Sequence, residues 1–314
     1  MLKAQYLKAA VVLLFNVMFI ILASRWFILH VDFKSILNEF YTIDQHSIYR
    51  ALILGVVLYL FYGFRLALLL DLELLKGIQI VVMGFGLNAL FPFRLGDLFK
   101  ILFSKQFFKV DLTQSSFATV IEKGFDLIII GSIALFFVAG GIKTFAITVI
   151  SIGLIYLIYI LLNSGAICQI PQIKIFKINQ IIVKCSTILS KSKLKGLIAS
   201  TLAIWVLTGY LFFTFFDLNI GSSEHFGVYD ALALMVMTTL SLSIPSMPAS
   251  LGVFESGIVY YLSNTFHFTP EKAVSYALIF HLVMIIPQVI TTLFILLINS
   301  IELCSKKELV HEST

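Results

Sequence analysis

The chain has 314 residues, of which 60% are hydrophobic and only 12% are charged, and its mean hydropathy is +1.01. A soluble domain carries about 25% charged residues, so this composition excludes an ordinary soluble protein and indicates an all-α integral membrane protein. The formal net charge of +5 comes largely from lysines between apolar runs, the pattern that orients membrane proteins. We therefore expect no nucleic acid partner.

Six apolar stretches are close to the length of about 20 residues that a helix needs to cross the hydrocarbon layer. They are residues 9–30, 48–70, 114–139, 142–162, 196–216 and 273–299. Two more stretches, 77–93 and 231–263, contain a polar break and are predicted to be half-spans. Lys3 and Lys8 precede the first run, which lacks a small-residue cleavage site, so we expect a retained span there rather than a cleaved signal.

A similar motif, Pro-x-x-Leu-Gly, breaks both half-spans. The first copy runs from Phe91 to Asp97 and the second from Met247 to Glu255. Irregular backbone at membrane depth is tolerated only where it is buried in protein or lines a cavity, and paired breaks in two halves point to the substrate site of a transporter. The predicted helix-break residues are Pro92, Gly96, Pro245, Pro248 and Gly252.

The loop charges predict a topology with internal symmetry. Loops 94–109 and 163–195 are basic, as are both termini, whereas loops 31–47 and 217–230 are acidic. The positive-inside rule is satisfied throughout if the termini are cytoplasmic and 77–93 enters and leaves on the same side. Residues 1–314 then form one domain of inverted halves, approximately 1–139 and 142–299. The sequence leaves open whether 77–93 and 231–263 are re-entrant or cross fully.

The segment 174–195 differs from the spans. Its isoleucines recur at helical spacing opposite lysines, which predicts a basic amphipathic helix on the cytoplasmic leaflet, with a plain orientation loop as the alternative. The three cysteines, Cys168, Cys185 and Cys304, show no metal-binding spacing, and on the predicted cytoplasmic side we expect reduced thiols.

Charged residues beside the first break are candidates for binding a lipid headgroup. Arg94 offers a guanidinium that matches phosphate geometry, at the start of a helix whose free amides attract anions. Asp97 and Lys100 follow at intervals of one turn, and for Lys100 a solvated cytoplasmic face is the favoured interpretation. Arg65, near the inner end of the second span, is expected to snorkel to the membrane surface and is given low weight.

Titratable residues also lie inside the predicted spans, where they are costly and usually functional. Glu122 and Asp126 are four residues apart and share a helix face, with Lys123 between them; Lys123 and Arg94 are their candidate cation partners. In the second half, Ser250 stands where the first copy has Arg94. Glu255 and His281 are titratable; His281 could pair with Glu255, relay a proton or only bond to a neighbouring helix.

These motifs resemble a known family. Pro92-x-Arg94-x-Gly96-Asp97-x-x-Lys100, then Glu122-Lys123-x-x-Asp126, then Pro248-x-x-x-Gly252-x-x-Glu255, are similar in order and spacing to the membrane domain of lysylphosphatidylglycerol synthase/flippase proteins. The resemblance covers nearly the whole chain, although the family often has Glu at Asp97 and Arg at Lys100 and Lys123. It implies a flippase that moves a phospholipid or lipid-linked headgroup between leaflets. No synthase domain follows the last span, so we do not expect this chain to make lysyl-lipid.

The expected protein is a multi-pass lipid translocase of the inner or plasma membrane, with anionic phospholipid or polyprenyl-phosphate lipid as partner. A homo-oligomer and a partner synthase or glycosyltransferase are left open. The sequence shows no catalytic motif, so no enzyme activity, metal or cofactor is expected. The alternatives are a membrane-embedded enzyme or partner in lipid-linked glycan synthesis, and a small-solute or ion transporter. The headgroup-binding candidates are Arg94, Asp97, Glu122, Lys123, Asp126, Ser250, Glu255 and His281.

Overall fold

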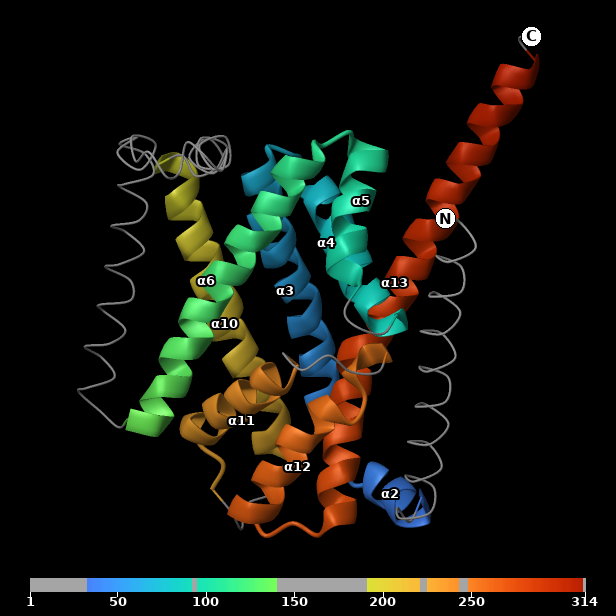
Figure 1. Cartoon of the computed structure of the whole chain (residues 1–314). Coiled ribbons are helices and arrows are strands. Elements are labelled where there is room, and N and C mark those ends of the chain that lie inside the picture. Colours follow the sequence, from blue (N-terminus) through green and yellow to red (C-terminus); the bar gives the residue numbers. More distant parts are fainter. Residues whose placement is uncertain (1–32, 92–94, 140–190, 221–224, 243–247, 313–314) are drawn as a thin grey trace, which may run out of the picture.

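The computed structural model describes residues 33–91, 95–139, 191–220, 225–242 and 248–312. Within these ranges every regular element is helical (Figure 1), and the all-α membrane class is confirmed. The predicted spans 9–30 and 142–162 lie outside the described residues, as do Pro92, Arg94, Pro245, Cys168, Cys185 and all of 174–190. Residues 191–195, predicted to end the amphipathic helix, instead begin a long helix.

The described helices follow the predicted order of spans and breaks. In the first half they are α2 (Phe33–Phe40), α3 (Gln45–Leu70), α4 (Leu74–Leu90), α5 (Gly96–Phe108) and α6 (Leu112–Ala139). In the second half they are α10 (Lys191–Ile220), α11 (Val228–Ser241), the short 3-10 helix η3 (Pro248–Ser250), α12 (Val253–Thr265) and α13 (Pro270–Glu312). Among the residues that the structure describes, three segments are long and apolar enough to cross a membrane: Gln45–Leu70, Lys193–Ile220 and Pro270–Ile298.

Local chemistry sets where these helices begin and end. Asp44 caps α3, because its carboxylate accepts a hydrogen bond from the backbone N–H of His46 at 2.7 Å. Asp71 ends the same helix in the left-handed conformation, with φ 56°, and its N–H donates to Ala67. Lys109 ends α5 in the same way. These ends let the chain reverse direction within a few residues.

Each break joins two helices that pack side by side as a hairpin. Figure 1 shows the α4–α5 hairpin in the upper half of the view and the α11–α12 hairpin in the lower half. In the first hairpin the contact is so close that a Cβ added at Gly96 would collide with the carbonyl oxygen of Gly84. The two hairpins also meet, because η3 packs against α4. Both breaks therefore approach the centre of the molecule.

The helix contacts repeat between the two halves. Helix α4 packs on α3 as α11 packs on α10, and α5 packs on α6 as α12 packs on α13. The cross-contacts match as well, since α4 lies against α13 and α11 lies against α6, while α3 and α10 pack together. Two similar halves related by an internal two-fold axis would form these pairs of packed helices. How each half is oriented in a membrane stays a prediction.

Candidate functional site

A central cavity of about 520 Å³ lies where the two hairpins meet, lined by residues from both halves. Its volume falls in the range of small-molecule sites, roughly 300–1,000 Å³. Six of the predicted headgroup residues line it: Asp97, Glu122, Lys123, Asp126, Ser250 and His281. Glu255 does not line it and lies behind His281, whereas Gly96, Pro248 and Gly252 shape the helix starts around it.

Four charged residues, three of them buried and one partly exposed, form a network on one wall of this cavity. Arg65 donates two hydrogen bonds to the Asp126 carboxylate, at 2.7 and 3.0 Å, and its Nε lies 3.4 Å from Glu122 Oε1. Lys100 Nζ binds the other oxygen of Glu122. Arg65 and Glu122 are each only 2% exposed. Two cations and two carboxylates therefore neutralise one another, which is what burial of charge requires.

Helix α10 completes the network. The indole N–H of Trp205 donates to Asp126 at 3.1 Å, and Arg65 donates to the Thr201 hydroxyl at 3.3 Å. Glu122 and Asp126 face the same way because they are four residues apart on α6. The network thus ties α3, α5, α6 and α10 together, and removing Arg65 or Glu122 would leave Asp126 or Lys100, respectively, without its ion-pair partner.

The structure corrects three predictions about these residues. Arg65 does not snorkel to the surface, because its guanidinium is held inside by two carboxylates. Lys100 is not on a solvated face and is 7% exposed. Lys123 does not neutralise Glu122 or Asp126, since its ion-pair partner is Asp97, at 3.4 Å on a half-exposed rim. The signal for Arg65 was its position inside an apolar span, where an ionisable residue is functional by default.

The second half carries a smaller buried pair. His281 Nδ1 lies 2.6 Å from Glu255 Oε1, and the residues are 4% and 6% exposed. The other Glu255 oxygen accepts the N–H of Gly252 at 2.7 Å, which caps the start of α12. Phe254 stacks on the imidazole, with ring centroids 4.1 Å apart. Of the roles considered for His281, the structure shows pairing with Glu255.

The backbone of the second break has an unusual conformation. Ala249 and Ser250 both have φ 57°, and Gly252 has φ 82°. Left-handed conformations are uncommon for residues other than glycine, and they persist where the surrounding structure enforces them. Here the result is that Ser250, only 7% exposed, lines the cavity.

Asn88 is a site residue that the sequence analysis missed. Its side-chain oxygen accepts a hydrogen bond from the N–H of Gly96 at 2.7 Å. This bond bridges the first break and satisfies one amide at the start of α5. Asn88 also lines the central cavity. A polar residue near the end of an apolar half-span was the available signal.

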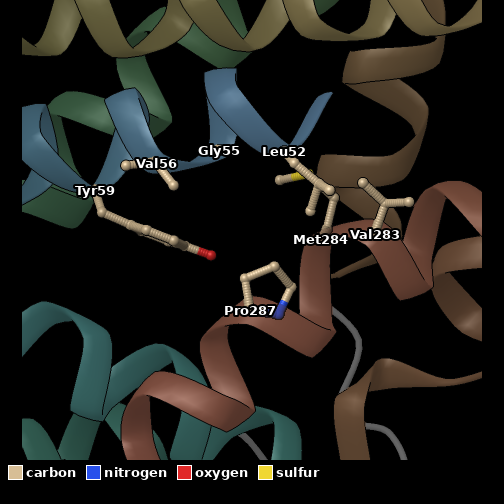
Figure 2. Close-up of a pocket in the computed structure, with 7 residues that line it drawn as sticks. All are labelled: Leu52, Gly55, Val56, Tyr59, Val283, Met284 and Pro287. Atoms are coloured by element: carbon tan, nitrogen blue, oxygen red, sulfur yellow. The ribbon is translucent and has the colours of Figure 1, made fainter. Parts of the chain in front are cut away.

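A narrow gap between α3 and α13 adjoins the cavity. Figure 2 shows its lining, with Tyr59 extending across the gap toward Pro287. Gly55, Tyr59 and Met284 line both this gap and the central cavity. Pro287 has no N–H to bond the carbonyl one turn earlier in α13. The gap and the central cavity are therefore neighbours along the α3–α13 contact.

This fold and site define an all-α membrane protein with a polar cavity between two broken helical hairpins. The model of the family described as the lysylphosphatidylglycerol synthase TM region matches residues 7–291. The chain belongs to this family, as its motifs indicated. No curated protein and no solved structure matches the chain. Within the described residues, no group of three or more His, Cys, Asp or Glu side chains is placed to hold a metal ion.

Proposed function

We propose that this protein is a lipid flippase that moves a phospholipid or lipid-linked headgroup between the two leaflets of a cell membrane. The observation that carries the proposal is the central cavity, which is lined by ion pairs inside an otherwise apolar bundle and bounded by both hairpins. Ionisable groups at membrane depth mark substrate pathways. Membership of the family supports a role with membrane lipids.

The size of the cavity fits a headgroup better than a whole lipid. A volume of about 520 Å³ accommodates a polar headgroup, so the acyl chains would stay in the bilayer and the headgroup would pass through protein. Such a route needs a lateral opening. The α3–α13 contact supports this requirement, because Gly55 there has no atom within 4 Å of an added Cβ and Val56 is 55% exposed.

The buried charge network is suited to form a fixed polar wall of the central cavity. Each of Arg65, Lys100, Glu122 and Asp126 already has a partner, so a passing headgroup would exchange water for an ordered polar surface without creating an unpaired charge. The sequence contains no P-loop, and we expect transport to be downhill or ion-coupled. We also propose that both termini face the cytoplasm and that the protein works without catalytic chemistry of its own.

The proposal is tested with labelled phospholipids in proteoliposomes. We expect the wild-type protein to speed the movement of label between leaflets over protein-free vesicles, and Arg94→Ala to slow it at equal incorporation. Equal rates for wild type and Arg94→Ala would remove Arg94 from the mechanism. Rates equal to those of protein-free vesicles for every lipid tried would contradict the proposal.

The same preparation separates the alternatives. Formation of a glycan product from a polyprenyl-phosphate donor by the purified protein would indicate an enzyme of lipid-linked glycan synthesis. Uptake of a small solute into vesicles without lipid movement would indicate a solute transporter. A flippase is expected to give neither result.

A further inference from the structure

The cations that line the central cavity are already occupied. Within the described part of the chain they are Arg65, Lys100 and Lys123, and their carboxylate partners are Glu122, Asp126 and Asp97. The positive and negative charges therefore balance. An anionic headgroup arriving at this wall would have to compete with carboxylates that are held in place. Free donors for an anion must be sought elsewhere in the cavity.

One free donor is the Ser250 hydroxyl. Ser250 lines the cavity and is 7% exposed. Its hydroxyl has no hydrogen-bond partner among the residues that the structure describes. A buried hydroxyl without a partner costs free energy, and this one sits on backbone held in the left-handed conformation. Strain and an unused polar group at one residue are typical of a ligand-binding position.

The second donor depends on protonation of His281. The imidazole lines the cavity, and its Nδ1 is bonded to Glu255, which leaves Nε2 for a ligand. A carboxylate partner holds the first ring proton on Nδ1. The neutral ring then presents a lone pair at Nε2, whereas the imidazolium presents an N–H. An anion at Nε2 therefore selects the ring that carries a second proton.

We propose that Ser250 and His281 form a phosphate-binding subsite, which holds the phosphate of a lipid headgroup and takes up one proton with it. This subsite rests on the proposed flippase function and assigns the phosphate to the second half of the molecule. The protonated ring would be neutralised by Glu255 on one side and by the phosphate on the other. Phe254, stacked on the ring, keeps it in the orientation that both partners need.

The other groups that face His281 do not compete for this role. From α12, Glu255 is the charged partner of the ring. From α4 and from α13 itself, Asn88 and Gln288 line the same cavity and are neutral. From α3, Tyr59 and Tyr62 line it as well, while the charged residues contributed by α3, α5 and α6 are those already paired.

Calorimetry on the full-length protein in a non-ionic detergent tests the subsite. Short-chain phosphatidylglycerol is titrated in two buffers that differ in ionisation enthalpy, and inorganic phosphate is titrated separately. We expect the heat of lipid binding to depend on the buffer, with uptake approaching one proton per lipid at alkaline pH. The affinity then falls by up to about tenfold per pH unit. Lipid binding tighter than that of inorganic phosphate supports a headgroup site, and phosphate binding without lipid binding overturns it.

Variants assign the effect to the two residues. His281→Gln is expected to abolish proton uptake, with His46→Gln, an exposed histidine, as its matched control. Ser250→Ala is expected to weaken binding about tenfold. Its control is Ser256→Ala, where an exposed hydroxyl bonds only within its own helix. Lipid binding by the wild type without any buffer dependence overturns the proposal, even if His281→Gln fails to fold.

The outcomes also separate this subsite from the flippase function. Proton-linked lipid binding without movement of lipid between leaflets would contradict the flippase and leave the subsite standing. Lipid movement whose rate and binding are the same for wild type, His281→Gln and Ser250→Ala would contradict the subsite and leave the flippase standing.

Discussion

The two halves of the molecule share an arrangement of helices but solve the problem of buried charge in opposite ways. Glu122 on α6 and His281 on α13 each follow a similar Ser-aromatic-Ala sequence. Each contacts the helix that precedes its own in the chain, α5 at Lys100 and α12 at Glu255. In the first half the acid lies on the later helix of the pair, and in the second half it lies on the earlier one. The first half adds Arg65 and Asp126, whereas the second half adds nothing charged within the described residues.

The two halves therefore place different charged groups at the cavity. In the first half two cationic and two acidic side chains join four helices through ion pairs and hydrogen bonds, so this network is a structural element. In the second half a single carboxylate, Glu255, is paired with the imidazole of His281. The first half therefore contributes a charged wall of the cavity, and the second half contributes His281 with Glu255 behind it.

The largest effect is expected from Arg65→Met. Removing the guanidinium leaves the partly exposed Asp126 without its cation and takes one of two cations from the buried Glu122, and breaking a buried ion pair costs up to about 3–5 kcal/mol. Thermal unfolding in detergent, followed by the loss of monodisperse protein, should show a large fall in Tm. Lys76→Met, which removes an exposed partner of Glu73, is the control. Similar Tm values for the two variants would mean that the network contributes little to stability.

The next largest losses of stability are expected from substitutions of the two glycines at the breaks, Gly96 and Gly252. Gly96→Ala is expected to destabilise by several kcal/mol, because its Cβ would meet backbone atoms of α4 that cannot move aside. Gly252→Ala has open space around it but a φ of 82°, so it should cost about 1–2 kcal/mol of backbone strain.

Gly124→Ala on α6 is the control for both glycine variants. It meets no atom within 4 Å, and a helical alanine in place of glycine should be neutral or stabilising by up to about 1 kcal/mol. If Gly96→Ala is no worse than Gly252→Ala, the close contact between α4 and α5 is not what fixes the first break.

A smaller loss is expected for Glu255→Gln. Glutamine keeps an oxygen that can accept from Gly252 or His281, so the variant removes charge and weakens two hydrogen bonds without emptying the site. We expect a loss of about 1–2 kcal/mol in unfolding measurements. A loss as large as that of Arg65→Met would show that the second pair contributes as much to stability as the network of the first half, and would contradict the difference between the halves.

The smallest effect is expected for Lys123→Met. Its ion pair with Asp97 is 3.4 Å long and its side chain is 47% exposed. Such pairs contribute less than about 1 kcal/mol. A Tm close to that of the wild type is the expected result, and a shift comparable to that of Glu255→Gln would place Lys123 within the buried network.

Much of the fold followed from hydropathy and loop charge. The spans 48–70, 114–139, 196–216 and 273–299 are helices, because continuous apolar runs of that length have no other way to satisfy their backbone in a bilayer. Most ends are extended by a few residues, whereas the last helix continues to Glu312. The shared face of Glu122 and Asp126 followed from their spacing. The pairing of Glu255 with His281 was one of the roles considered.

Hydropathy did not predict the contacts between residues that are distant in sequence. Arg65 and Asp126 are 61 residues apart, and no periodicity reports a contact between two different helices. Lys100 looked solvated because the segment around it is basic, yet the close packing of α5 on α4 turns it inward. Asn88 bridges a break whose geometry depends on both hairpins. These are tertiary effects, decided by packing rather than by local pattern.

The most direct test of the account asks whether lipid headgroups pass through the central cavity. Thr208 and Val206 lie two residues apart on α10; Thr208 lines the cavity, and Val206 is 70% exposed on the outer surface. In proteoliposomes at equal incorporation, Thr208→Trp should reduce lipid movement between leaflets to the rate of protein-free vesicles. Val206→Trp should match the wild type. Wild-type rates for both variants would contradict passage through this cavity.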